Sequence, residues 1–73
     1  MEYFQRIKAA RIDKDLKQED TARALKTTRQ QIYKYENGLQ EMTVSKLRDL
    51  CLYYNISADY VLGLPHGLDW PRE

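Results

Sequence analysis

Apolar residues recur every three or four positions along most of the chain, and no segment alternates between apolar and polar residues as a strand would. This spacing is typical of amphipathic helices that bury one face. The pattern predicts an all-α fold, a compact bundle of five short helices joined by connections of a few residues. We expect the helices at residues 3–14, 18–25, 28–36, 43–54 and 57–63.

Polar residues mark where three of these helices begin. Thr43 and Ser57 stand at N-cap positions, where a hydroxyl group can accept a hydrogen bond from a free backbone N–H of the first turn. Thr28, followed by Gln31 three residues later, has the spacing of a capping box. After its cap, the fourth helix should turn one apolar stripe to the core: Val44, Leu47, Leu50, Cys51 and Tyr54.

The chain changes character after Gly63, which is suited to ending the fifth helix. The last ten residues, "LPHGLDWPRE", contain two prolines and a glycine. Such residues interrupt regular structure. We therefore expect one domain over residues 1–63 and an irregular tail over residues 64–73.

The second and third predicted helices are joined by a short turn, and small Ala22 stands where they would cross, which is typical of a helix-turn-helix. At about 100° per residue, Ile32 and Tyr35 turn to the core. The opposite face carries long polar side chains: Arg29, Gln30, Tyr33 and Lys34. Such a face can read base edges in a major groove, with Arg or Lys on guanine and Gln on adenine.

The stretches "LKQEDTARALKTTRQQIYKYENG" and "NISADYVLG" resemble the phage-repressor and Cro-type helix-turn-helix family of bacterial transcriptional regulators, also called the xenobiotic-response-element family. The resemblance covers residues 6–64. It implies a lambda-repressor-like five-helix domain that places its third helix in the major groove of double-stranded DNA. It also implies a homodimer on a palindromic operator. We expect the regulator to be a repressor.

The resemblance gives further residues a role. Gln18 would contact the DNA backbone at the start of the second helix, and Asn37 and the backbone after Gly38 would contact phosphates. Arg11 and Glu36 match a pair that joins the first helix to the third in this family. The role of that pair is structural.

The chain departs from the family pattern at four positions. Lys17 replaces the Thr or Ser that caps the second helix, and its charge beside a helix N-terminus predicts a phosphate contact. Thr21 replaces an aliphatic residue, whereas Asp15 and Lys26 replace glycines. A positive φ at Lys26 would cost about 1 kcal/mol or more. Gln31, placed as a cap, is also a candidate phosphate contact.

The end of the chain offers apolar side chains for a dimer. Two predicted recognition helices about 34 Å apart would reach successive major grooves, so a two-fold dimer is expected. The candidate interface lies on the fifth helix and the tail: Tyr60, Val61, Leu64, Leu68 and Trp70. In the alternative, Trp70 folds back over its own core.

Composition narrows the remaining choices. Seventy-three residues build one modest core, with little room for an enclosed active site. Cys51 is the only cysteine and His66 the only histidine, so no disulfide, cysteine zinc cluster or catalytic group can be assembled. We expect no enzyme activity, no metal, no cofactor and no domain for a small molecule. The single cysteine fits a reducing compartment, so a cytoplasmic protein is expected. No apolar run approaches the roughly 20 residues of a membrane span.

The net charge of +1 is unevenly distributed. Residues 1–36 hold nine Lys or Arg against six Asp or Glu, whereas residues 37–73 hold three against five. A basic first half suits a polyanion, although ordinary scatter would give a similar division. The alternative function is a protein-interaction module, an antitoxin-like or anti-repressor partner that kept this fold without binding an operator.

Overall fold

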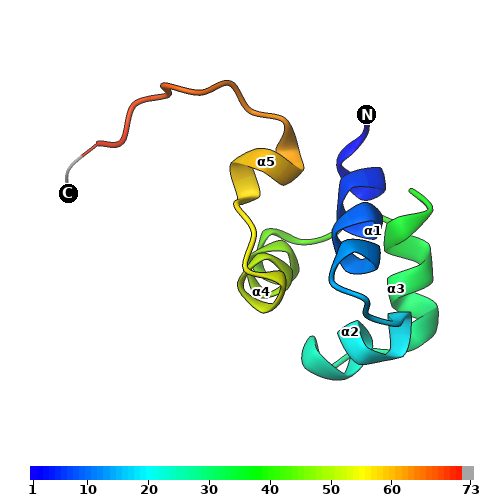
Figure 1. Ribbon diagram of the computed structural model, residues 1–73. Coiled ribbons are helices and arrows are strands. Elements are labelled where there is room, and N and C mark those ends of the chain that lie inside the picture. Colours follow the sequence, from blue (N-terminus) through cyan, green and yellow to red (C-terminus); the bar gives the residue numbers. More distant parts are fainter. Residues whose placement is uncertain (72–73) are drawn as a thin grey trace.

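Five helices make up the regular structure of residues 1–71, the part of the chain that the computed structural model describes (Figure 1). They are α1 Tyr3–Asp13, α2 Gln18–Ala24, α3 Arg29–Glu36, α4 Val44–Tyr54 and α5 Ala58–Leu62. The all-α prediction is confirmed, and every predicted boundary lies within one residue of the observed one. None of these helices is long and apolar enough to span a bilayer.

The side-chain caps explain why the boundaries could be predicted so closely. The hydroxyl group of Thr28 accepts from the backbone N–H of Gln31 at 3.1 Å, and that of Thr43 accepts from Lys46 at 3.2 Å. Ser57 accepts from Asp59 at 3.1 Å. Only half of the capping box predicted for Thr28 forms, because in residues 1–71 the side chain of Gln31 makes no return bond.

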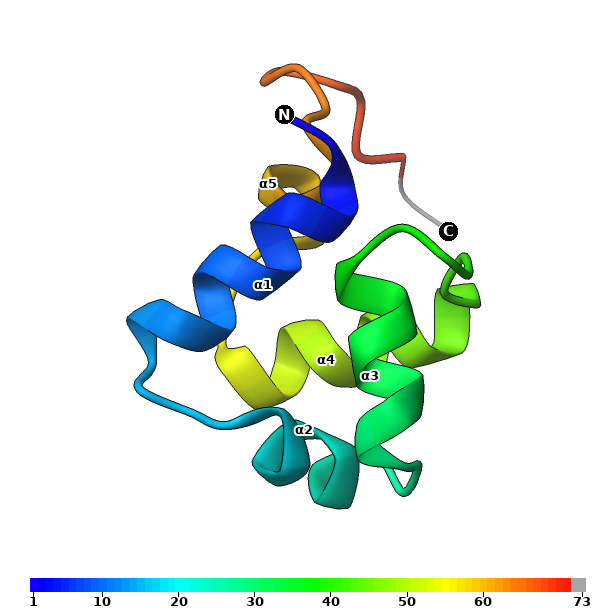
Figure 2. The same ribbon diagram turned by 90° about the vertical axis from the view of Figure 1, so that its right-hand side faces the viewer.

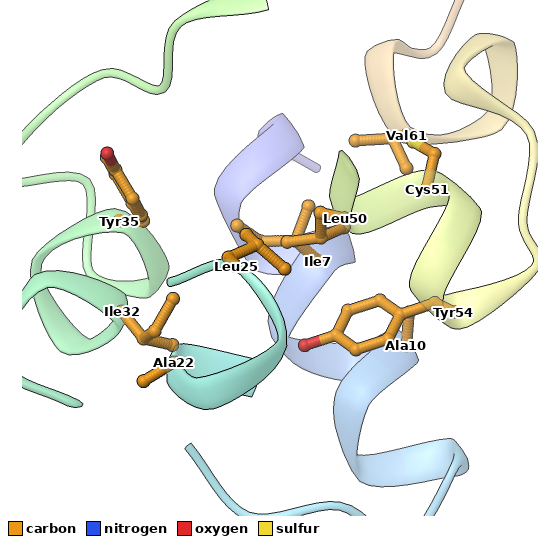
Figure 3. Packing of buried hydrophobic residues seen from close by; sticks show 10 residues of the cluster. All are labelled: Ile7, Ala10, Ala22, Leu25, Ile32, Tyr35, Leu50, Cys51, Tyr54 and Val61. Atoms are coloured by element: carbon orange, nitrogen blue, oxygen red, sulfur yellow. The ribbon is translucent and has the colours of Figure 1, made fainter. Parts of the chain in front are cut away.

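The helices pack around one core. α2 packs against α3, and α1 lies between α3 and α5 (Figures 1 and 2). The buried side chains come from all five helices and from the turn after α2 (Figure 3): Ile7, Ala10, Ala22, Leu25, Ile32, Tyr35, Leu50, Cys51, Tyr54 and Val61.

Two residues lie elsewhere than the sequence predicted. Val44, expected in the core stripe of α4, is 84% exposed. It occupies the first position of the helix, and α4 meets the core only from Leu47 onward. Val61, predicted for a dimer interface, is 0% exposed and belongs to the same buried cluster as Cys51 of α4 (Figure 3). That assignment of Val61 is wrong, because α5 uses this side chain to pack on its own domain.

The turns before and after α2 adopt left-handed backbone geometry at non-glycine residues. The φ angles are 60° at Asp15 and 57° at Lys26, so the strain predicted at Lys26 is present. The ammonium group of Lys46 donates to the carbonyl of Leu25 at 2.6 Å, which ties the turn between α2 and α3 to α4. A carbonyl at the end of a helix favours such a cation. We infer that Lys46 helps to hold the strained turn.

A buried hydrogen bond explains the unusual threonine in α2. The hydroxyl groups of Thr21 and Tyr54 are 2.7 Å apart, and both residues are almost completely buried. Burial raises the pKa of Tyr54 to about 12. An aliphatic residue at position 21 would leave the Tyr54 hydroxyl group without this partner. The two buried hydroxyl groups therefore satisfy each other's hydrogen bonding.

Replacing Thr21 tests this compensation. Thr21→Val keeps the shape but strands the hydroxyl group of Tyr54, and we expect it to lower the free energy of unfolding by about 1–3 kcal/mol. In a Tyr54→Phe background the same change should cost much less. Urea unfolding of the four proteins of this double-mutant cycle gives the coupling. Equal losses in both backgrounds would show that the bond contributes nothing.

The tail leaves α5 and runs away from α1 (Figure 1). Its apolar side chains are exposed, with Leu64 at 44%, Leu68 at 61% and Trp70 at 91%. The alternative in which Trp70 folds back over the core is therefore not adopted. The predicted irregular tail has no helix over residues 64–71, and its last two residues, 72 and 73, lie outside the described part of the chain.

Candidate nucleic-acid interface

The long polar side chains predicted on α3 lie on its outer side. Arg29 and Gln30 are exposed, Tyr33 is 49% exposed and Lys34 is half-buried. On the inner side, Ile32 and Tyr35 are buried at 2% and 6% exposure. One short helix thus presents cationic, amide and aromatic groups to solvent while its other face anchors it to the core.

A buried ion pair joins the end of α3 to α1. Arg11 of α1 meets Glu36 at the end of α3 through two hydrogen bonds, Nε–Oε2 at 2.7 Å and Nη2–Oε1 at 3.1 Å. The side chains are only 11% and 2% exposed. Arg11 also donates to the carbonyl of Leu16 at 2.7 Å. The hydrogen bond to Glu36 raises the pKa of Arg11, so the pair remains charged and fixes α3 against α1.

Gln18 connects this pair to the outer face of α3. Its amide nitrogen donates to Oε1 of Glu36 at 3.0 Å, so the carboxylate receives bonds from two helices besides its own. Its amide oxygen lies 3.5 Å from Nη1 of Arg29. The first residue of α2 therefore stands between the buried charge and the first residue of α3. The sequence placed Gln18 near DNA but did not reveal this link.

The start of α2 is capped by Asp20, an acidic residue of its first turn. Lys17 occupies the N-cap position with an exposed side chain that makes no capping bond. Its backbone N–H donates instead to the carboxylate of Asp20 at 2.8 Å. A carboxylate in the first turn also suits the helix dipole. The position of Asp20, three residues after the N-cap, is the local sequence signal for this backbone cap.

The segment after α3 is shaped by a close approach to α1. Asn37 donates its side-chain amide to the carbonyl of Tyr33 at 2.8 Å. Gly38 has a φ of +69°, and a Cβ there would lie 2.8 Å from the ring of Phe4. Only glycine fits both the backbone angle and this contact. Asn37 and Gly38 are exposed, so their backbone is accessible beside the end of α3.

Gln31 is placed less favourably for contact with a partner. It is half-buried, and its Nε2 atom is buried with no hydrogen-bond partner in the described part of the chain. The other predicted contacts are Lys17 and Gln18 at the start of α2, and Asn37 and Gly38 just after α3. The structure thus supplies polar groups along α3, just after it, and at the start of α2.

Comparison with known proteins identifies this arrangement of helices. A family model described as a helix-turn-helix domain matches residues 4–66. Among solved structures, the P22 c2 repressor protein, crystallised in complex with a synthetic operator in the presence of Tl+, is similar with a TM-score of 0.79. The two chains share 22% sequence identity over 85% of this chain and 94% of the repressor chain. No curated protein gives a significant sequence match.

Proposed function

Because this chain belongs to the family of helix-turn-helix domains, as its sequence resemblance indicated, we propose that it is a transcriptional regulator that binds double-stranded DNA. We further propose that it acts as a repressor, with α3 in the major groove of a palindromic operator. The observation that carries the proposal is the outer face of α3, where four polar side chains gather on a helix anchored by Ile32 and Tyr35.

Each side chain on this face has a distinct role in base recognition. Arg29 binds guanine through two hydrogen bonds, and Gln30 binds adenine in the same manner. Lys34 binds guanine or a phosphate, and Tyr33 lies between the positions of these readers. Arg29 and Gln30 are the first two residues of α3. The N-terminal residues of a recognition helix are the ones that contact base edges.

Groups at the start of α2 and just after α3 contact the DNA backbone in this proposal. Lys17 and Gln18 bind phosphate at the start of α2, and Asn37 and the backbone at Gly38 do so after α3. These contacts fix the register of the domain on the duplex without reading the sequence. Gln31 is the weakest candidate, because burial limits the reach of its amide group.

Selection of bound sequences from a random pool of duplex DNA tests the proposed function. We expect one enriched half-site, repeated with two-fold symmetry at a spacing of about one helical turn. Affinity for the selected duplex should fall steeply with salt, as each phosphate contact releases counterions. If no sequence is enriched and binding does not depend on salt, the protein-interaction module becomes the better assignment.

Lys17→Thr tests the phosphate contact at α2. A threonine at this N-cap can accept a backbone hydrogen bond that lysine cannot, so we expect the unfolding free energy to rise by about 1 kcal/mol. The slope of log affinity against log salt should become shallower by about 0.9 per subunit. An unchanged slope would mean that Lys17 makes no phosphate contact, whatever its effect on stability.

The exposed apolar side chains near the end of the chain supply the proposed homodimer contact. Tyr60 is 52% exposed on α5, and Leu64, Leu68 and Trp70 are exposed along the tail. With Val61 buried, the interface consists of these four residues. A small isologous contact of this kind would place two copies of α3 on one palindromic site.

Truncation after Leu64 tests the homodimer. Removing Leu68 and Trp70 takes away the most exposed apolar part of the interface, so we expect the association constant measured by sedimentation to fall. The intact chain is the control. An intact protein that remains monomeric at high micromolar concentration, or an association constant unaffected by the truncation, would contradict the interface.

A further inference from the structure

A hollow lies on the outer face of α3. It is lined by Arg29, Gln30 and Tyr33, and its volume is about 340 Å³. Tyr33 lies three positions after Gln30 and four positions after Arg29, so its side chain neighbours both of theirs on the helix surface. These three side chains therefore border one open space on the surface proposed to enter the major groove.

One side of the hollow is apolar. Tyr33 leaves about half of its surface exposed, at 49%, even though it is one of the large side chains of a small domain. The Tyr33 side chain is not part of the buried core, and within residues 1–71 the side chain and the backbone N–H of Asn37 both donate to its backbone carbonyl and leave its ring unused. The ring is thus free to contact an apolar group that enters from outside.

The guanidinium group of Arg29 makes part of the hollow cationic. Nη1 of Arg29 lies 3.5 Å from the Oε1 atom of Gln18, whose nitrogen is bonded to buried Glu36. This contact holds the guanidinium group of Arg29 near the start of α2, and Tyr33 lies one helical turn further along α3. The hollow thus combines a group suited to guanine with a ring suited to an apolar contact.

We propose that this hollow binds a thymine next to the guanine read by Arg29, with the thymine 5-methyl group against the ring of Tyr33. The proposal rests on the proposed DNA-binding function and adds a specificity-determining residue to it. In the major groove, the methyl group of thymine is the one apolar group that a base pair presents. A thymine and an adjacent guanine thus match the apolar and the cationic sides of the hollow.

Replacing thymine by deoxyuridine tests the proposal, because the exchange removes the methyl group and keeps base pairing. Each thymine of the half-site selected from the random pool is replaced in turn, symmetrically in both half-sites. At one position, next to the base read by Arg29, we expect affinity to fall about fourfold for each methyl group lost. The other positions should change little.

Two variants assign the effect to the ring. Tyr33→Phe keeps the ring and should retain the dependence on the methyl group. Tyr33→Ala removes the ring and should bind the thymine and deoxyuridine duplexes equally. Because the Tyr33 side chain is half-exposed, both variants should fold, and circular dichroism checks this.

The outcomes separate this proposal from the function on which it rests. A selected half-site without thymine, no effect of deoxyuridine at any position, or an undiminished effect with Tyr33→Ala would each overturn the thymine subsite and leave sequence-specific DNA binding intact. Failure to enrich any sequence would overturn the proposed function and the subsite together.

Discussion

Glu36→Gln should lower the free energy of unfolding by about 3–5 kcal/mol, because it leaves a buried charge without its partner. The substitution removes the carboxylate that receives hydrogen bonds from Arg11 and Gln18. Because the side chain of Arg11 is only 11% exposed, its charge would stay buried without a counterion. Folded domains are stable by about 5–15 kcal/mol in total, so much of the population would unfold on mild heating. Urea unfolding followed by circular dichroism measures the loss.

A double replacement separates the cost of an unpaired charge from the value of the pair itself. Arg11→Met with Glu36→Leu exchanges the ion pair for apolar side chains, and such exchanges are often neutral or stabilising in proteins. We expect the double variant to be more stable than Glu36→Gln alone. If Glu36→Gln changed stability by less than about 1 kcal/mol, the pair would behave as an exposed salt bridge.

Arg29→Ala should relax base preference at one position of each half-site. A bidentate contact between arginine and guanine gives about 1–3 kcal/mol of discrimination against other bases. Removing it should therefore reduce specificity at that position by roughly 5- to 150-fold in affinity ratio. Repeating the selection with the variant, and measuring affinities for duplexes changed at that one base pair, gives both quantities.

Arg48→Ala is the matched control for charge. Arg48 is exposed on α4 and pairs with its neighbour Asp49 at 3.2 Å, so its removal takes the same charge from another helix. The base preference of the Arg48→Ala variant should equal that of the unchanged protein. Should Arg29→Ala weaken binding to all sequences by the same factor, Arg29 would be a phosphate contact and its assignment as a base reader would be wrong.

Much of the fold could be predicted because the signals for helix boundaries are local. The caps at Thr28, Thr43 and Ser57 bond to groups two or three residues away. Such bonds depend only on the backbone of one turn, and the sequence contains both partners. The outward placement of Arg29, Gln30 and Tyr33 follows in the same way from helical periodicity and the apolar residues between them.

The arrangement of side chains between helices could be predicted only where a family pattern supplied it. Arg11 and Glu36 are 25 residues apart, and nothing in their neighbourhoods indicates a pair. The bond from Lys46 to the carbonyl of Leu25 and the link from Gln18 to Glu36 were not anticipated at all. Each joins segments whose relative position the local sequence does not encode.

Val61 illustrates the same limit. Its place one residue after Tyr60 on a five-residue helix is compatible with either an interface or the core. Packing against α1 and α4 buried it completely and left Tyr60 half-exposed. A helix of little more than one turn shows too little periodicity to distinguish its two faces, so only the docking of neighbouring helices could decide.

The sequence by itself determined the five helices, their ends, and the group of side chains that α3 carries on one face. Those features depend on hydrogen bonds and spacing within a few residues. Only the tertiary structure decided that Thr21 bonds to Tyr54, that Glu36 is shared by Arg11 and Gln18, and that Arg29 is drawn toward α2. These contacts required helices distant in the chain to meet, and their geometry follows from how the whole core packs.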